Sequence, residues 1–383
     1  MPELPEVEHY RQLLLPLVSK KGNNAIFEFG PPPLPTKRFP SQETIDLINR
    51  GNYTITNILR KGKVICMILE RRRYETTTTK ATADAKANAK AKVVVTNAGI
   101  KQANNDMITG NEATLLISLH MGMTGRISSP NHIPKLESLS DEGISYPPPH
   151  THLIIKSSSS PTNNNEQLQA CFSDPRRFGS VFVQKYDGQT NSNNDFDEEF
   201  IPVFNELAPD ALLATGHSTN HDLIVNKLIN LKRSIKAILL DQRDVMSGVG
   251  NWVADEVLYR SRLHPDQSFL TESEARKLVL EIQFVLSTAV RCLNDGVDFP
   301  KDWLFHRRWR GGGGSTSSIK DFNGKTISFI TSSGRSSGRL CFIIERSHDT
   351  LLDPCYIYSS VLSRSHSYRS FLAEKGCQKS RCT

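Results

Sequence analysis

The sequence of 383 residues is long enough for two domains and leaves length for insertions. Its 38% hydrophobic and 23% charged residues are typical of a soluble globular protein, and it contains no run of 18 apolar residues that would predict a membrane span. The first twenty residues lack the basic start and apolar core of a signal peptide, so we expect an intracellular protein, and the net charge of +7 permits a nucleic-acid partner without requiring one.

The chain begins MPELPEVE, which predicts a helix over about residues 5–20. Pro5 suits a first helical turn, and Glu6 and Glu8 favour the positive end of the helix dipole. This explanation leaves Pro2 and Glu3 without a role.

Two segments rich in β-branched and apolar residues, 53–70 and 114–127, predict strands. The sequence between them, near 74–113, is biased toward Thr, Ala, Lys and Asn and predicts a flexible basic insertion. A short helix or a DNA-contacting arm is the alternative. Similar interruptions near 129–149 and 157–167 separate further strands.

Residues 186–200 have the polar composition of a linker, and the pattern after them is helical. Helical spacing covers 224–240 and 251–263, and Thr271–Glu274 forms a capping box ahead of a third helix. An Asn-Gly turn within 322–340 predicts a short hairpin.

The seven cysteines are odd in number and scattered, without a Cys-x-x-Cys pair, so we expect reduced thiols rather than a disulfide framework. The last four have 13, 21 and 4 residues between them, which argues against a ribbon-like zinc site. These four are Cys341, Cys355, Cys377 and Cys382. We expect neither a metal nor a cofactor.

Proline at position 2 favours removal of the initiator methionine, which exposes a secondary amine at Pro2. An α-amine has a reference pKa near 8, against about 10.4 for lysine, so more of it is unprotonated at neutral pH. Such an amine can attack an electrophilic sugar carbon and form an iminium ion, with Glu3 beside it as acid and base.

The first eight residues, MPELPEVE, resemble the N-terminus of formamidopyrimidine-DNA glycosylases, a family that also contains endonuclease VIII. The resemblance implies that Pro2 is the nucleophile, that Glu3 is the general acid or base, and that Glu6 supports the catalytic pocket. In RKGK at 60–63, it implies that Lys63 contacts a phosphate beside the lesion. Without the resemblance, Lys63 is a solvated lysine at the start of a strand.

Two further blocks resemble segments that the family inserts into DNA. HMGMTGR at 120–126 implies that Met123 fills the gap left by the extruded base, although an isolated methionine is more often core packing. DPRRFG at 174–179 implies that Arg176 and Phe178 enter the duplex opposite the lesion, where the alternative is a surface turn.

SGVGNWVADEVLYRSRLHP at 247–265 resembles the helix-two-turn-helix of this family. The glycines allow close backbone approach, and Asn251 stands at a helix start, where a phosphate is stabilised. By analogy, Lys236 contributes basic character nearby. The segment before the turn is one residue longer between its Asp and Gly than in bacterial members.

Bacterial members end in a four-cysteine zinc finger, whereas GKTISFITSSGRSS here resembles the metal-free hairpin of plant and fungal members. That resemblance implies that Arg335 binds the phosphate on the 3′ side of the lesion. Because SSGR is repeated, Arg339 is the alternative.

The resemblance implies an α+β fold, with an N-terminal β-sandwich domain that carries an N-terminal helix, a helix-two-turn-helix domain, and a zincless hairpin finger. The expected division is a catalytic domain, a linker, a DNA-binding domain, a finger and a disordered tail. Their respective ranges are 1–185, 186–200, 201–310, 311–340 and 341–383.

The implied function is a bifunctional DNA glycosylase and abasic-site lyase that removes oxidised purines, namely formamidopyrimidines, hydantoins and 8-oxoguanine, with β,δ-elimination. An endonuclease VIII-like preference for oxidised pyrimidines is the first alternative, which Leu4 disfavours because those members usually carry glycine there. A non-catalytic damaged-DNA-binding protein is the second. We expect a monomer that acts on double-stranded DNA containing oxidised bases or abasic sites, and no membrane partner. The expected compartment is the nucleus, with another DNA-containing organelle as the alternative.

Overall fold

The computed structural model describes residues 2–19, 24–29, 38–71, 114–134, 144–157, 168–186 and 201–307 apart from 217 and 231, together with residues 322 and 324. The whole predicted 74–113 insertion lies outside these residues, and so does the predicted 186–200 linker apart from Tyr186. So do nearly all of the predicted hairpin, with Arg335 and Arg339, and the whole 341–383 tail.

The N-terminal half contains two four-stranded sheets whose strand pairs are all antiparallel. One sheet has the order β1 (Ala25–Phe29), β6 (Thr151–Ser157), β7 (Gln169–Ser173) and β5 (Arg126–Ser128). The other has the order β2 (Tyr53–Lys61), β3 (Val64–Arg71), β4 (Thr114–His120) and β8 (Ser180–Lys185). A shared apolar core packs both sheets with α1 (Leu4–Leu14). The predicted strands are therefore confirmed.

The first helix is shorter than the predicted 5–20. Helix α1 ends at Leu14, and a single 3₁₀ turn, η1 (Leu15–Leu17), follows it. Pro16 explains the change, because proline lacks an N–H and its ring disfavours a continuing α-helix. Strand β1 and helix α2 (Gln42–Arg50) were not predicted, although Ser41 caps α2 by accepting a bond from the Thr44 amide at 3.3 Å.

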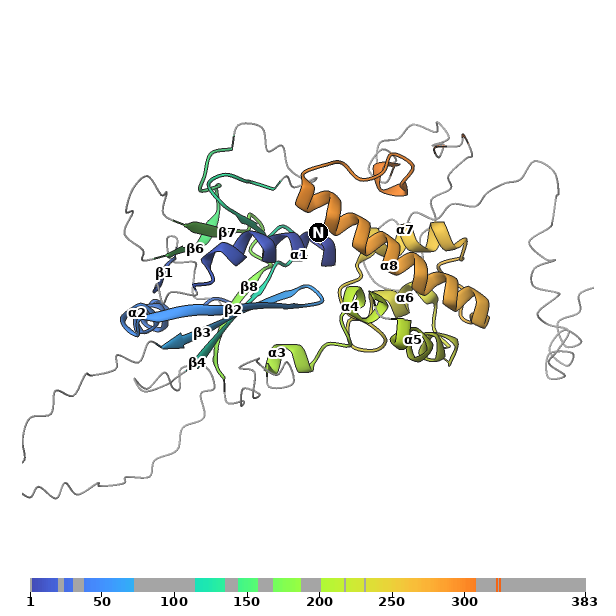
Figure 1. The fold of residues 1–383 in the computed structure, drawn as a ribbon, viewed down its shortest axis with the longest axis horizontal. Helices are drawn as coiled ribbons and strands as arrows, with labels where there is room; N and C mark the ends of the chain where they lie inside the picture. The colour runs from blue at the N-terminus through green and yellow to red at the C-terminus, as the bar shows by residue number, and fades with distance from the viewer. Residues whose placement is uncertain are drawn as a thin grey trace, which may run out of the picture.

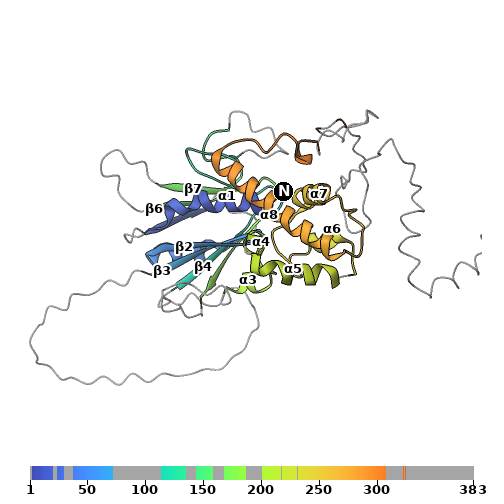
Figure 2. The same cartoon turned by 45° about the vertical axis from the view of Figure 1, so that its right-hand side comes forward.

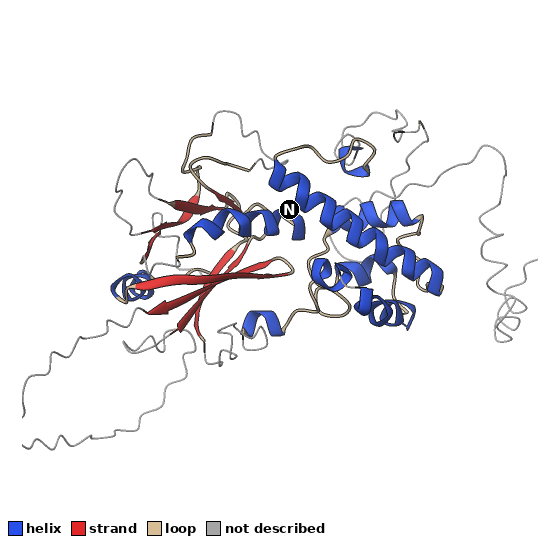
Figure 3. Cartoon of the chain, viewed as in Figure 1, coloured by secondary structure: helices blue, strands red, loops and turns tan. Residues whose placement is uncertain are grey.

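The second half of the structure is helical, as the sequence predicts (Figures 1 and 3). Its helices are α3 (Pro202–Asn205), α4 (Ala211–Gly216), α5 (Ser218–Asn230), α6 (Ile235–Leu240), α7 (Asn251–Ser261), α8 (Glu272–Asp295) and the 3₁₀ turn η3 (Leu304–Arg307). The helical pattern of 224–240 is divided between α5 and α6. The Thr271–Glu274 capping box of α8 is confirmed.

The start of the chain lies where the sheets meet the helical half (Figures 1 and 2). Leu4 is fully buried in the core of the helical half, whereas Val7 of the same helix belongs to the core between the sheets. Helix α1 therefore joins the two halves and holds the first residues at their boundary. Among the described helices, none is both long and apolar enough to cross a membrane.

Candidate active site

The Glu3 side chain is bound at the N-terminus of α7. Its two carboxylate oxygens accept hydrogen bonds from the amides of Trp252 at 2.8 Å and Val253 at 3.0 Å, and the residue is only 2% exposed. The first turn of a helix has unsatisfied N–H groups and a partial positive charge, which together stabilise a carboxylate. Glu3 therefore caps a helix that begins 248 positions later in the chain.

The glycine-rich turn before α7 makes room for the start of the chain. A Cβ atom on Gly250 would lie 2.3 Å from Cδ of Glu3, and one on Gly248 would lie 2.4 Å from a methyl carbon of Leu4. The Leu4 amide donates to the Gly248 carbonyl at 3.1 Å. The φ of Gly250 is −124°, an ordinary extended value, so the contact with Glu3 is what requires glycine there.

We expect Gly250→Ala to lower lesion excision by about a hundredfold, because the new methyl group displaces the Glu3 carboxylate and small displacements of catalytic groups have effects of that size. Excision should be measured on a lesion-bearing duplex under single-turnover conditions. Gly216→Ala is the control, since a Cβ there has no neighbour within 4 Å. Equal activity of the two variants would contradict this role of Gly250.

Glu6 links the start of α1 to the indole of Trp252. Its Oε2 accepts from the Glu3 amide and its Oε1 from the Trp252 ring N–H, both at 3.0 Å. Burial, with a further contribution from the charge of Glu3, raises the pKa of Glu6 to about 8. Its negative charge is thus disfavoured at this buried position, while its two oxygens orient the Glu3 amide and the Trp252 indole.

Lys63 lies close to the two glutamates. Burial lowers the pKa of its ammonium, while the charges of Glu3 and Glu6 act in the opposite direction. Pro2 is buried beside Glu3 in the chain. The structure therefore gathers Pro2, Glu3, Glu6 and Lys63 at the boundary between the two halves.

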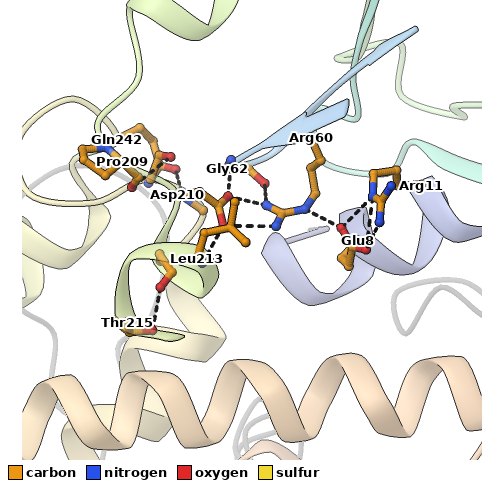
Figure 4. Close-up of polar contacts among 12 residues, drawn as sticks. Glu8, Arg11, Arg60, Gly62, Pro209, Asp210, Leu213, Thr215 and Gln242 are labelled. Atoms are coloured by element: carbon orange, nitrogen blue, oxygen red, sulfur yellow. Dashed lines mark hydrogen bonds and ion pairs between the residues drawn. The ribbon is translucent and has the colours of Figure 1, made fainter. Parts of the chain in front are cut away.

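The turn that carries Lys63 is anchored to the helical half by a buried network around Arg60 (Figure 4). The Arg60 guanidinium donates to Glu8 Oε2 at 2.7 Å and to both carboxylate oxygens of Asp210, at 3.1 Å for Oδ1. Asp210 also accepts from the Gly62 amide at 2.7 Å. The network holds Lys63 at a set position relative to α1 and to the start of α4, where Asp210 also accepts from the Leu213 amide at 3.2 Å. Neither Arg60 nor Asp210 belongs to the motifs that predicted site residues from the sequence.

Met123, Arg176 and Phe178 lie on two adjacent exposed turns. Met123 is 42% and Phe178 is 47% exposed, which is unusual for large apolar side chains, and Arg176 is also exposed. Gly122 has a φ of +59°, and a Cβ there would lie 2.4 Å from the Phe178 backbone, so the turns are in direct contact. This exposure argues against core packing for Met123, and the roles of the three in DNA stay predictions.

Asp174 holds both turns in place. Its buried carboxylate accepts from the Thr124 hydroxyl at 2.6 Å, from the Arg176 amide at 3.2 Å and from the Gly179 amide at 2.7 Å. Asp174 was not among the predicted site residues, although it begins the DPRRFG block. An aspartate directly after a predicted strand, with a glycine five residues further on, is the sequence signal of a loop held by an aspartate side chain.

Lys236 is buried, which does not agree with the DNA-binding role predicted for it from the sequence. It is 1% exposed and forms a buried ion pair with Asp255 of α7. The structure therefore disagrees with the DNA-binding role predicted for Lys236, because the ammonium group of this lysine is buried and paired with Asp255. The periodic sequence of α6 could not show which face of the helix packs on α7.

Asn251 is the first residue of α7 and is partly buried, and its phosphate contact stays a prediction.

Comparison with known proteins gives a consistent result for both halves. The N-terminal domain of formamidopyrimidine-DNA glycosylase matches residues 1–181, and the helix-two-turn-helix domain of the same enzyme matches residues 207–301. A formamidopyrimidine-DNA glycosylase of Wolbachia pipientis is 30% identical over 76% of this chain and 78% of its own length. The chain belongs to the formamidopyrimidine-DNA glycosylase family.

Other members of the family resemble the chain over different lengths. The Arabidopsis thaliana relative, also a formamidopyrimidine-DNA glycosylase, is 36% identical over 45% of this chain and 40% of its own length. A solved structure of the Thermus thermophilus protein covers 89% of this chain and 97% of its own, with a TM-score of 0.51 and 23% identity. The Lactococcus lactis enzyme, in a structure bound to DNA containing an abasic site, aligns with a TM-score of 0.51 and 20% identity. These structures confirm the fold.

Within this family fold, we expect Asp174→Asn to reduce excision from duplex DNA by about tenfold, since losing hydrogen bonds to a buried carboxylate costs about 1–3 kcal/mol. Cleavage of a preformed abasic site in single-stranded DNA should change less, because no helix has to be opened there. Both rates should be measured on matched oligonucleotides, with the exposed Asp222→Asn as the control. Equal losses on both substrates would show that Asp174 serves the general fold.

Proposed function

We propose that this chain is a base-excision-repair DNA glycosylase with abasic-site lyase activity, in which the amine of Pro2 is the nucleophile. The observation that carries the proposal is the placement of Glu3. It lies next to Pro2 in the chain and is buried at the boundary between the halves, with both oxygens bound by α7 amides. A carboxylate in this position has a defined orientation and can exchange a proton with a nearby sugar.

In the proposed reaction, the Pro2 nitrogen attacks C1′ of the damaged nucleotide and the bond from C1′ to the base breaks. The base leaves with a proton, and the sugar stays attached to Pro2 as a ring-opened iminium ion. Loss of a proton from C2′ then expels the 3′ phosphate, and a second elimination expels the 5′ phosphate. Hydrolysis of the iminium ion frees Pro2.

The other site residues have supporting roles in this proposal. Lys63 binds the phosphate beside the lesion, and Glu6 orients Glu3 and Trp252 through the bonds described above. Met123, Arg176 and Phe178 fill the space left by the flipped nucleotide, which offsets part of the few kcal/mol that flipping costs. Asn251 and the finger arginine, Arg335 or Arg339, bind the DNA backbone.

Borohydride trapping tests the proposal. The purified protein should form a covalent adduct with duplex DNA that contains an abasic site or an oxidised purine, and peptide mapping should place the adduct on the N-terminal peptide. A protein that binds this DNA without any adduct, after removal of Met1 has been confirmed, would be the damaged-DNA-binding alternative. Parallel assays with oxidised purines and oxidised pyrimidines compare the two lesion classes, and we expect formamidopyrimidines and hydantoins to be preferred.

A glycosylase of this kind acts in a compartment that contains DNA, and we propose the nucleus. Imaging of the chain with a fluorescent tag at its C-terminus tests this, because a tag at the other end would block Pro2. Signal confined to another DNA-containing organelle would contradict the nuclear assignment.

A further inference from the structure

Two histidine rings meet on the side of α1, at a point where three separate segments come together. His9 of α1 and His132, in the turn after β5, place their Nε2 atoms 3.1 Å apart, with the ring centroids 5.1 Å apart and the rings nearly perpendicular. His9 is 6% exposed, whereas His132 is exposed. The glycosylase reaction proposed above uses neither residue.

Asn294 in the last turn of α8 determines which nitrogen of His9 carries the proton. Its Oδ1 lies 3.0 Å from His9 Nδ1, and an amide oxygen can only accept a hydrogen bond, so Nδ1 is the donor. In the neutral ring, the lone pair is then on Nε2, which points toward His132. A ring oriented by an Nδ1–H bond to an oxygen, with its free Nε2 directed at one point, is the usual arrangement of a metal-binding histidine.

The backbone holds His132 in place without covering it. Ser129 and His132 exchange two hydrogen bonds, from the Ser129 amide to the His132 carbonyl at 2.9 Å and from the His132 amide to the Ser129 carbonyl at 3.1 Å. This closed turn presents the second ring to His9 while its outer side remains open to solvent. An ion can therefore reach the pair without unfolding the segment.

The distance between the two nitrogens suits a shared ion. Two imidazole nitrogens bound to a tetrahedral zinc, each about 2.0–2.1 Å from it, are about 3.3–3.4 Å apart, close to the spacing of this pair. We propose that His9 and His132 form an exchangeable binding site for a divalent transition metal ion such as Zn²⁺, with water as the remaining ligands.

The chemistry of the pair fits this class of ion. Imidazole ligands suit zinc, copper and nickel, whereas magnesium and calcium prefer oxygen. Before an ion binds, the proton between the two Nε2 atoms belongs to neutral His132; on binding, His132 takes up its proton on Nδ1 through solvent instead, so that both Nε2 lone pairs face the ion. Among the described residues, no third His, Cys, Asp or Glu completes a larger metal cluster, so the site differs from a closed structural zinc centre.

Calorimetric titration of Zn²⁺ into the chelator-treated full chain at pH 7.5 tests the proposal. His132→Ala should lose one equivalent of bound zinc relative to the unmodified chain, and because His132 is exposed the variant should keep its fold by circular dichroism. Asn294→Leu should bind that equivalent about tenfold or more weakly, since removing a partner that orients a ligand has this effect. His150→Asn, which removes another exposed histidine, should bind zinc like the unmodified chain.

Thermal unfolding gives a second readout that does not depend on DNA or catalysis. A ligand that binds the folded state raises the unfolding temperature, so Zn²⁺ should stabilise the unmodified chain more than His132→Ala. The proposal is overturned if the unmodified chain binds no zinc, or if His132→Ala binds it with unchanged stoichiometry and affinity. An equal loss in His150→Asn would also overturn it, because the effect would not be specific to the pair.

Discussion

Inserting one glycine between Met1 and Pro2 is expected to abolish borohydride trapping and lower strand cleavage by about a thousandfold or more, the scale of effect that follows removal of a nucleophile. The reason is chemical: Pro2 would become part of a peptide bond, and an amide nitrogen cannot form an iminium ion. The start of the chain is also closely packed, since Leu4 is fully buried and its amide bonds to Gly248 at 3.1 Å. In the insertion variant the free amine is on the added glycine, which lies one residue further from Glu3 than Pro2 does.

Pro2→Gly is the matched control for that insertion. It keeps a free α-amine at the same place in the chain and should retain a measurable share of the trapping. Both variants should be checked by mass spectrometry for removal of Met1 and by thermal unfolding for an unchanged fold. If the insertion variant were trapped as efficiently as the unmodified chain, the nucleophile would be a different group, and lysine would be the first candidate.

Replacing Arg60 with methionine is expected to lower the free energy of unfolding by about 3–5 kcal/mol, the usual cost of removing one partner from a buried ionic network. The Arg60 side chain is 4% exposed, and its partners Glu8 and Asp210 are 9% and 4% exposed. Without the guanidinium, Asp210 is buried without its cation, and Glu8 keeps only its bonds to Arg11 and Gln12. Denaturant unfolding measures the loss, and lesion excision should fall as well, because this network anchors the turn that carries Lys63.

Arg243→Ala is the control for the Arg60 variant. Arg243 forms an ion pair with Glu206 at 3.0 Å, but the two side chains are 74% and 70% exposed. Exposed pairs contribute about 0–1 kcal/mol, so this variant should unfold nearly like the unmodified chain. Similar losses from both substitutions would mean that burial of the Arg60 network adds little to the free energy of unfolding.

The sequence by itself determined those features that depend on local chemistry. Alternating and helical patterns predicted most of the strands and helices, because side-chain periodicity reflects which face of an element is buried. The capping box at Thr271–Glu274 was readable for the same reason, since both partners lie within one turn. The family was recognisable because its motifs are short and contiguous, from MPELPEVE to the glycine-rich turn before Asn251.

Local patterns failed where a neighbour distant in the chain decides the outcome. The sequence showed a lysine at position 236 in a basic segment, but in the structure this lysine forms a buried ion pair with Asp255. Arg60 and Asp210 are 150 positions apart and were not identified. Helix α2 and strand β1 were also missed, because short elements have little periodicity to read.

The opening residues show both kinds of determination. The sequence predicted a reactive amine at Pro2, with the carboxylate of Glu3 beside it, and it predicted the helix that follows. Only the tertiary structure decided that this carboxylate lies at the N-terminus of α7, with Gly250 leaving the space for it and with Glu6 and Lys63 close by. The physical reason is that a helix terminus can stabilise any anion that reaches it, and the packing of α1 across the two halves brings Glu3 there.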